Sequence, residues 1–479
     1  MKYKLLRIPV CFSIFFCLFS CSKFSADNNV ISTAVQPPIV PITDTVPLCG
    51  SIAGTMLAGK TYHIDCDITV DTGKSLTIQP GARLIFNNQS GLIVKGNLFS
   101  LGTKENPIWM TVEGQTHTDA PIKNYKASHD SAFSGLWKGV AADVTCNYLI
   151  FKWTHLEYTG AVAGIHGSSF YSVAAIKTTD NAYAIFFPNT NGIFVLEDSW
   201  IYGCINDAVR VGGNGGRFAI MRSTFEKCGK SSNDGLNIKA GGIGVLAYNL
   251  CVGGATNSLK AANSGAVAGI PTCNVDTYNN TVINSGYRNT STGKGGSINY
   301  ENGARGRVFN NLIINCKYGL RLNTLTPDTT FMYAGNYGYN YYWADSLSVA
   351  NEFIPFTPGS ITKPSSTDIP NPNSYLPANY NYLPDAQYDG SSVVQLAGSN
   401  PLFINYPLPV KGGYNLADIA AVGNFNFHLQ SSSPCRGIGY TSFSPIQVVP
   451  TDPVFGVTTF SLPGKDIGCF QLDGSGNQH

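Results

Sequence analysis

The 479-residue sequence is poor in charged side chains, which make up only 13% of it. Its 31 basic and 29 acidic residues nearly cancel, and no electrostatic case for nucleic acid follows from that balance. A convincing amphipathic helix longer than two turns is also missing after residue 20. These absences exclude nucleic-acid binding driven by charge and argue against a helical enzyme.

Paired metal-binding motifs are missing as well. The 13 cysteines include no Cys-x-x-Cys cluster, and the seven histidines are scattered, so we do not expect a structural zinc site. Cys49 and Cys66 flank the start of the expected fold. They either form a disulfide or remain buried thiols, and the sequence leaves both alternatives open.

What the sequence has instead is 43% hydrophobic residues together with abundant Gly, Asn, Ser, Thr and Tyr. That hydrophobic content excludes a largely disordered chain, and the amides and hydroxyls suit a long solvated β surface. Short alternating segments at 76–78, 84–86 and 92–94 are separated by Gly and Asn turns. This pattern is typical of successive short strands.

The first 20 residues have the pattern of an export signal. Lys2, Lys4 and Arg7 precede a twelve-residue apolar run at 8–19, which is too short to span a bilayer as a stable helix. Removal of this signal takes away three basic residues and no acidic ones, which changes the formal net charge from +2 to −1. We therefore expect an exported protein.

The apolar run ends in Leu-Phe-Ser-Cys at 18–21, which resembles the bacterial lipobox, although Phe19 is bulkier than the usual residue. We expect lipidation of Cys21, which would make the lipid bilayer a partner of the anchored N-terminus. The alternative is an ordinary signal with a chance cysteine. The polar, proline-punctuated residues that follow suit an extended tether.

The middle of the chain repeats itself. Similar segments begin at Asp198, Arg222, Tyr248, Asn279 and Asn310, in steps of 24, 26, 31 and 31 residues. Each segment has a polar turn and a short strand and closes on a small residue, so variable steps indicate loops inserted at one corner of a coil. We expect stacked three-strand coils with equivalent inward positions and ladders of aligned Asn side chains.

Four segments carry a family resemblance: Leu76-Thr-Ile-Gln-Pro-Gly81, Asn106-Pro-Ile-Trp-Met-Thr111, Asn400-Pro-Leu-Phe403 and Asp466-Ile-Gly-Cys-Phe470. Through these segments the chain resembles, over most of its length, the right-handed parallel β-helix (pectate-lyase-like) surface lipoproteins that are common in Bacteroidetes. The resemblance implies an all-β, right-handed parallel β-helix. It does not decide activity, because that family includes polysaccharide lyases, glycoside hydrolases and adhesins.

The expected organisation follows from these patterns. It comprises a lipoprotein signal at 1–20, a tether at 21–48, the right-handed parallel β-helix at 49–343, a long insertion at 344–398, and a C-terminal coil and cap at 399–479. The insertion is rich in Pro, Asn and Tyr, and it is either a binding loop or decoration. Where relatives usually carry alanine this chain has Cys435 and Cys469, so a second disulfide is one alternative.

Two Asn-Asp turns precede the second strands of consecutive repeats, and stacking should make Asp207 and Asp234 neighbours on one outer edge. Close carboxylates share a proton or bind Ca²⁺, the kind of site on which pectate-lyase-like enzymes depend. In this hypothesis Arg210 neutralises a uronate, and Lys239 or Arg210 accepts a proton. The alternative is structural, because Asn-Asp pairs are favoured turn residues and exterior arginines are normally solvated.

A carbohydrate surface is expected beside these residues. Asn237 and Arg321 should point outward from the same series of strands. Tyr337, Tyr339 and Trp343 offer rings for stacking on sugars if they are exposed, although tyrosines also fill β-helix faces.

These expectations combine into a cell-envelope lipoprotein of the outer membrane, on its periplasmic or surface side, whose exterior groove binds polysaccharide or glycan. One alternative is an enzyme proper, either a glycoside hydrolase or a lyase acting by β-elimination on a uronate polymer. The other is a non-catalytic adhesin or structural protein with a protein partner. Ca²⁺ is the one cofactor suggested.

Overall fold

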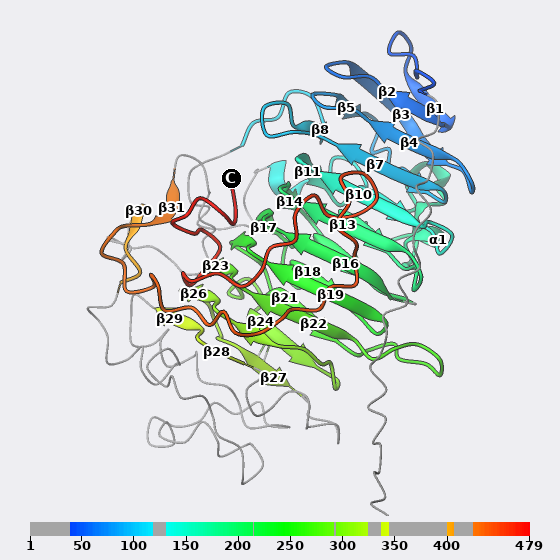
Figure 1. Ribbon diagram of the computed structural model, residues 1–479. Coiled ribbons are helices and arrows are strands. Elements are labelled where there is room, and N and C mark those ends of the chain that lie inside the picture. The colour runs from blue at the N-terminus through cyan, green and yellow to red at the C-terminus, as the bar shows by residue number, and fades with distance from the viewer. Residues whose placement is uncertain are drawn as a thin grey trace, which may run out of the picture. The chain divides into compact units, whose positions relative to one another are not determined.

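The computed structural model describes residues 39–117, 131–213, 215–291, 294–323, 337–343, 400–406 and 425–479. The chain divides into two compact units between Ile39 and Val40. Nearly all described residues belong to the second unit, which is an all-β, solenoid-like fold of parallel strands (Figure 1). The helices of the described part are η1 (Ser131–Phe133), η2 (Ile165–Gly167) and α1 (Phe170–Val173).

The first series of strands forms a ten-stranded sheet in which each strand pairs in parallel with the strand one coil further along. Its members are β2 (Gly54–Met56), β4 (Ser75–Ile78), β7 (Asn97–Leu101), β10 (Tyr148–Lys152), β13 (Ile193–Glu197), β16 (Gly216–Met221), β19 (Gly242–Ala247), β22 (Asn274–Tyr278), β25 (Val308–Phe309) and β28 (Tyr337–Gly338).

The second and third series belong to one 19-stranded sheet, joined through the long strand β3 (Thr61–Val70), which also pairs with β1 (Leu48–Ser51). The second series is β5 (Arg83–Phe86), β8 (Ile108–Thr111), β11 (Thr154–Thr159), β14 (Trp200–Cys204), β17 (Thr224–Cys228), β20 (Leu250–Val252), β23 (Thr281–Ile283), β26 (Leu312–Ile314) and β29 (Tyr341–Trp343). The third series is β6 (Leu92–Val94), β9 (Val140–Ala142), β12 (Ile185–Phe187), β15 (Val209–Val211), β18 (Leu236–Ile238), β21 (Asn257–Ala262), β24 (Gly296–Glu301) and β27 (Arg321–Asn323).

The register of the second series confirms the predicted repeat. Trp200 pairs with Thr224, and the same level continues through Leu250, Thr281 and Leu312. These are the residues that the sequence alignment of the repeats made equivalent. Each predicted step of 24 to 31 residues is therefore one coil.

Inward side chains of the three series fill the interior of the solenoid. At each position along a strand, every coil contributes one such side chain, which stacks on its equivalent in the next coil. In the second series the inward residues of successive coils are Ile201, Phe225, Cys251, Val282 and Ile313, and all are buried in one apolar cluster. A single coil could not bury such residues, so stacking supplies the hydrophobic stabilisation of the fold.

A ladder of buried amides runs along the corner between the first and second series. The N–H of Asn249 donates to Oδ1 of Asn280 (2.9 Å), and the N–H of Asn280 donates to Oδ1 of Asn311 (3.0 Å). The side-chain amides of Asn249 and Asn280 donate along the same ladder (3.1 and 2.9 Å). The expected Asn ladder is thus confirmed, and it pairs polar groups that would otherwise be buried without partners.

The outer face of the ten-stranded sheet is covered by residues 425–479, which we call the C-terminal segment. Outward side chains such as Val195, Ala219 and Val245 are fully buried and cluster with Phe443 and Val457 of that segment. In Figure 1 the segment is the orange-to-red trace that crosses the strands. It includes β31 (Asn426–Leu429), which pairs with β30 (Phe403–Asn405).

The C-terminal segment reaches further than the coil and cap expected from the sequence. Phe455 contacts Phe99 and Tyr148, which belong to β7 and β10 near the start of the solenoid. The outer face of the first series is apolar, so its burial against this segment adds a second layer of hydrophobic packing outside the coils.

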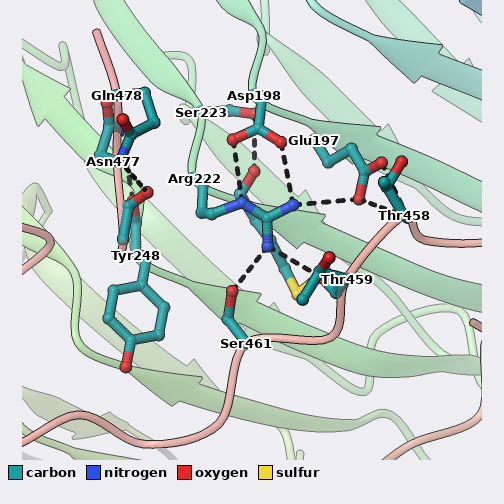
Figure 2. A network of polar contacts seen from close by, with 12 residues as sticks. Glu197, Asp198, Arg222, Ser223, Tyr248, Thr458, Thr459, Ser461, Asn477 and Gln478 are labelled. Atoms are coloured by element: carbon teal, nitrogen blue, oxygen red, sulfur yellow. Dashed lines mark hydrogen bonds and ion pairs between the residues drawn. The ribbon is translucent and has the colours of Figure 1, made fainter. Parts of the chain in front are cut away.

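Buried charges fasten this segment to the sheet (Figure 2). The Arg222 guanidinium donates twice to Asp198 (2.9 Å each) and once to Glu197 (3.1 Å). Its remaining nitrogen, Nη1, donates to Oγ of Ser461 (2.6 Å) and to the Thr459 carbonyl (3.0 Å). Atoms from both the sheet and the C-terminal segment are therefore needed to satisfy one buried cation.

The N-terminal boundary lies earlier than predicted. The compact unit begins at Val40, whose carbonyl accepts the N–H of Thr55 (2.7 Å), whereas the tether was expected to extend to residue 48. Of the disulfide alternatives, Cys49 and Cys66 are bonded, but Cys435 and Cys469 are separate buried thiols.

Two predicted regions lie outside the described residues: the N-terminal signal with Cys21, and the insertion at 344–398. None of the described helices has the length and apolar character needed to cross a membrane.

Candidate functional site

Outward side chains of the third series form what we call the polar row. It consists of Arg210 of β15, Asn237 of β18, Lys260 of β21, Asn299 of β24 and Arg321 of β27, each in register with the next. The register places the predicted residues Arg210, Asn237 and Arg321 on one line, as expected. It also adds Lys260 and Asn299, which the sequence reasoning missed because neither of their strands was recognised.

The predicted carboxylates lie beside the row and are joined to it. The N–H of Asp234 donates to Oδ1 of Asp207 (2.8 Å). Nδ2 of Asn237 donates to Oδ2 of Asp207 (2.8 Å) and to Oδ2 of Asp234 (3.1 Å). Burial, reinforced by the nearby charge of Asp234, raises the pKa of Asp207. The two carboxylates are neighbours, as predicted, and they also cap the turns of the coils.

The donor set for a metal ion is weak. Among the described residues no group of three or more His, Cys, Asp or Glu side chains is placed to hold a metal. Both carboxylates already accept backbone and amide hydrogens, which reduces what they offer to Ca²⁺. Ca²⁺ binding at Asp207 and Asp234 therefore stays a prediction without structural support.

Two cations of the row are paired with carboxylates. Nη1 of Arg210 lies 3.4 Å from Oδ2 of Asp207, and the Arg210 side chain is 29% exposed. Nζ of Lys260 lies 3.3 Å from Asp234 and 2.8 Å from Glu301. Burial alone would lower the pKa of Lys260, but these two carboxylates outweigh it and the pKa is raised. Lys260 is therefore a firmly charged member of the site.

Glu301, at the end of β24, is the acidic residue that the sequence reasoning overlooked. Burial alone would raise its pKa, but Lys260 and the nearby Lys239 outweigh that effect, so the pKa of Glu301 is lowered. The charge stays on Glu301 and offsets part of the positive potential of the row.

Lys239 differs from the other cations. It is half-buried directly after β18, and it forms no ion pair with any of the residues that the structure describes. Burial, aided by the positive charges of Lys260 and Arg210, lowers the pKa of Lys239 to about 8. Lys239 therefore exchanges its proton near neutral pH and is free to meet a ligand.

Three amide oxygens at the row are buried without a hydrogen-bond partner: Oδ1 of Asn237, Asn257 and Asn299. Their orientation is fixed, because the amide nitrogens donate to carboxylates, as Asn257 does to Asp234 (2.8 Å) and Asn299 to Glu301 (3.1 Å). An unpaired buried acceptor costs about 1–3 kcal/mol, and similar atoms occur elsewhere among the described residues, such as Oδ1 of Asn274.

Arg321 lies at the end of the row but is turned away from solvent. Its Nη1 donates to the Gly295 carbonyl (2.6 Å), and its guanidinium lies 5.1 Å from the centre of the Tyr318 ring. Burial lowers the pKa of Arg321. It lies outward on the strand, as predicted, but its surroundings are those of a packed residue.

The expectation that Tyr337, Tyr339 and Trp343 form an exposed aromatic surface is wrong. Tyr337 points into the interior and is 1% exposed, while Trp343 is 5% exposed and packs in the outer apolar cluster. Tyr339 stacks on Tyr440 of the C-terminal segment, with ring centres 5.1 Å apart. These rings fill the faces of the solenoid, which was the structural alternative.

Comparisons with known proteins add no relative: no family model, no curated protein and no solved structure matches this chain. Any function must therefore be argued from the geometry of the described residues.

Proposed function

We propose that this chain is a cell-envelope lipoprotein whose body, a right-handed parallel β-helix, binds an acidic polysaccharide at the polar row. The observation that carries the proposal is the group of three neighbouring cations: Arg210, which is partly exposed, Lys239, and the firmly charged Lys260. The Arg210 side chain is 29% exposed, and Lys239 lacks an ion-pair partner among the described residues. Uronate carboxylates suit such cations, and sugar hydroxyls suit the surrounding amides.

The lipid anchor is a separate part of the proposal and rests on the sequence at 18–21. Bacteria that express the full chain should incorporate a labelled fatty acid into it, and the Cys21→Ser variant should not be labelled. Equal labelling of both forms would overturn the anchor and leave the proposal on glycan binding standing.

The glycan proposal is tested by electrophoresis of the full chain in gels that contain polygalacturonate or neutral dextran. We expect retardation by polygalacturonate alone, and at least tenfold weaker retardation of the double variant Arg210→Gln, Lys239→Gln. The matched control is Arg217→Gln, which removes an exposed cation from β16 in the other sheet. If the wild type is not retarded, the proposal that the chain binds an acidic polysaccharide is overturned. The alternative of an adhesin with a protein partner then remains.

The lowered pKa of Lys239 favours a second candidate, a lyase that acts by β-elimination. A general base works best with a pKa near the operating pH, and the pKa of about 8 meets that condition. Incubation with polygalacturonate should then release an unsaturated product that absorbs in the ultraviolet, and Lys239→Gln should abolish it. If the wild type releases no such product from a panel of uronate polymers, the chain binds without cleaving.

A further inference from the structure

A cavity of about 1050 Å³ lies on the C-terminal segment, and no residue of the polar row lines it. Its walls are Tyr248, from the corner after β19, and three stretches of the segment within 431–441, 459–466 and 471–476. The volume lies just above the range of about 300–1,000 Å³ that small-molecule sites usually occupy. The C-terminal segment therefore lines a hollow that is partly open to solvent.

The walls of this cavity are held in place by hydrogen bonds. Oη of Tyr248 donates to the Leu462 carbonyl (2.5 Å). The Asp466 carboxylate accepts the N–H groups of Gly437 and Leu472 (2.9 Å each), which joins all three stretches. A cavity whose walls are fixed before a ligand arrives loses little conformational entropy on binding.

One cation of the cavity lacks an acidic partner. Arg436 donates through Nη1 to the Ser431 carbonyl, its Nε is buried without a partner, and no carboxylate among the described residues is within ion-pair distance. Lys465 adds a second, exposed cation. Asp466 is already engaged as described, and Asp473 accepts hydrogens from Ser475 (2.9 and 2.5 Å). The group left to be neutralised is the Arg436 guanidinium, which matches a carboxylate geometrically.

The rest of the lining is suited to a sugar. Ser431, Ser432 and Thr441 contribute hydroxyl groups. Apolar surface comes from Phe460 and from Leu462 and Leu472, which are 66% and 49% exposed. Hydroxyl groups beside an apolar wall match the alternating edges and faces of pyranose rings.

We infer that this cavity is a second carbohydrate site, which binds a short acidic oligosaccharide with its carboxylate on Arg436 and Lys465. The inference rests on the proposed glycan binding and extends it, because a polymer held at the polar row and at the cavity would engage the chain twice. Two linked contacts raise the apparent affinity without any new interaction.

The test is isothermal titration of the full chain with trigalacturonate, using maltotriose as the neutral trisaccharide. Trigalacturonate should bind, and Arg436→Gln should weaken that binding at least tenfold. Lys465→Gln, at an exposed position where folding is not at risk, should weaken it severalfold. Arg217→Gln serves as the control and should leave it unchanged, and thermal unfolding checks that each variant is folded.

Each remaining outcome decides between the two sites. Unchanged binding in both Arg436→Gln and Lys465→Gln overturns the cavity, and a loss in Lys239→Gln instead assigns trigalacturonate to the polar row. If wild type binds polygalacturonate but not trigalacturonate, the cavity fails and the proposed function survives. If it binds neither, both proposals fail. Equal affinity for maltotriose overturns the role of the carboxylate.

Discussion

Single side chains in this protein satisfy the backbone of a neighbouring coil, and Asn280 is the clearest example. It is fully buried, it accepts two hydrogen bonds from Asn249, and it donates to the Leu246 carbonyl and to Asn311. Asp207 does the same in the turn between the second and third series, where it caps the N–H of Asp234. Polar residues therefore specify the register while apolar ones supply the hydrophobic stabilisation.

Replacement of Asn280 by Ala should lower the free energy of unfolding by about 3 kcal/mol, because several buried groups lose their partners at once. Urea unfolding followed by circular dichroism measures the change. Asn191→Ala is the matched control, since Asn191 is exposed and its side chain has no hydrogen bond to the described residues; it should stay within about 0.5 kcal/mol of wild type. Equal effects of the two changes would contradict the ladder's importance.

The lowered pKa of Lys239 predicts how the free energy of unfolding changes with pH. Its pKa falls from 10.5 in the unfolded chain to about 8 in the folded one, so between those values the unfolded chain binds more protons. The penalty for the buried charge is complete below pH 8 and disappears as the pH rises towards 10.5. Lys239→Gln should therefore be more stable than wild type at pH 7, and the difference should shrink towards zero near pH 10.5.

Urea unfolding of both proteins between pH 7 and 10.5 checks this prediction. Subtracting the two curves removes the contributions of the buried cysteines and tyrosines, which both proteins share. A difference that stays constant across this range would show that Lys239 keeps an ordinary pKa.

Elements of the solenoid were predictable where the repeat is regular. The segments from Asp198 and Arg222 fall in register as aligned, because their strands keep the same pattern of inward and outward residues. The strands β21 and β24 were missed, because insertions around them lengthen the step from one coil to the next. Lys260 and Glu301 lie on these strands and were therefore missed as well. Extending the register from Arg210 and Asn237 would have found both strands.

The C-terminal segment was the other element that the sequence reasoning missed. A signal for it exists, because 193–196 and 218–221 are continuous apolar runs, and alternating strands would be expected if one face met water. What the sequence cannot show is which distant residues supply the cover. That depends on tertiary contacts such as Phe455 against Phe99.

The attachment of the C-terminal segment depends on Arg222. Arg222→Met removes the guanidinium and leaves Glu197 and Asp198 buried with fewer partners, which should cost about 3 to 5 kcal/mol. We expect the segment to detach first, so limited proteolysis should cut within 440–470 much faster than in wild type. Arg217→Gln removes an exposed cation of β16, the strand that ends just before Arg222, and should digest like wild type. Identical cleavage of Arg222→Met would contradict the fastening role.

At the scale of the molecule, the third series keeps a polar outer row whereas the first series is buried under the C-terminal segment. A ligand that runs along the coils would therefore meet Arg210, Lys239 and Lys260. Partly exposed charges lie at that row together with amide oxygens that have no partner among the described residues.

The most direct test of the account is the reactivity of one amine. At pH 7.5, limited acetylation of the full chain followed by mass spectrometry reports the rate at Lys239, whose lowered pKa makes it reactive, and at the exposed Lys177 as an internal control. Saturating polygalacturonate should slow acetylation of Lys239 at least fivefold and leave Lys177 unchanged, and dextran should affect neither. Equal rates at Lys239 with and without polygalacturonate would contradict glycan binding at the polar row.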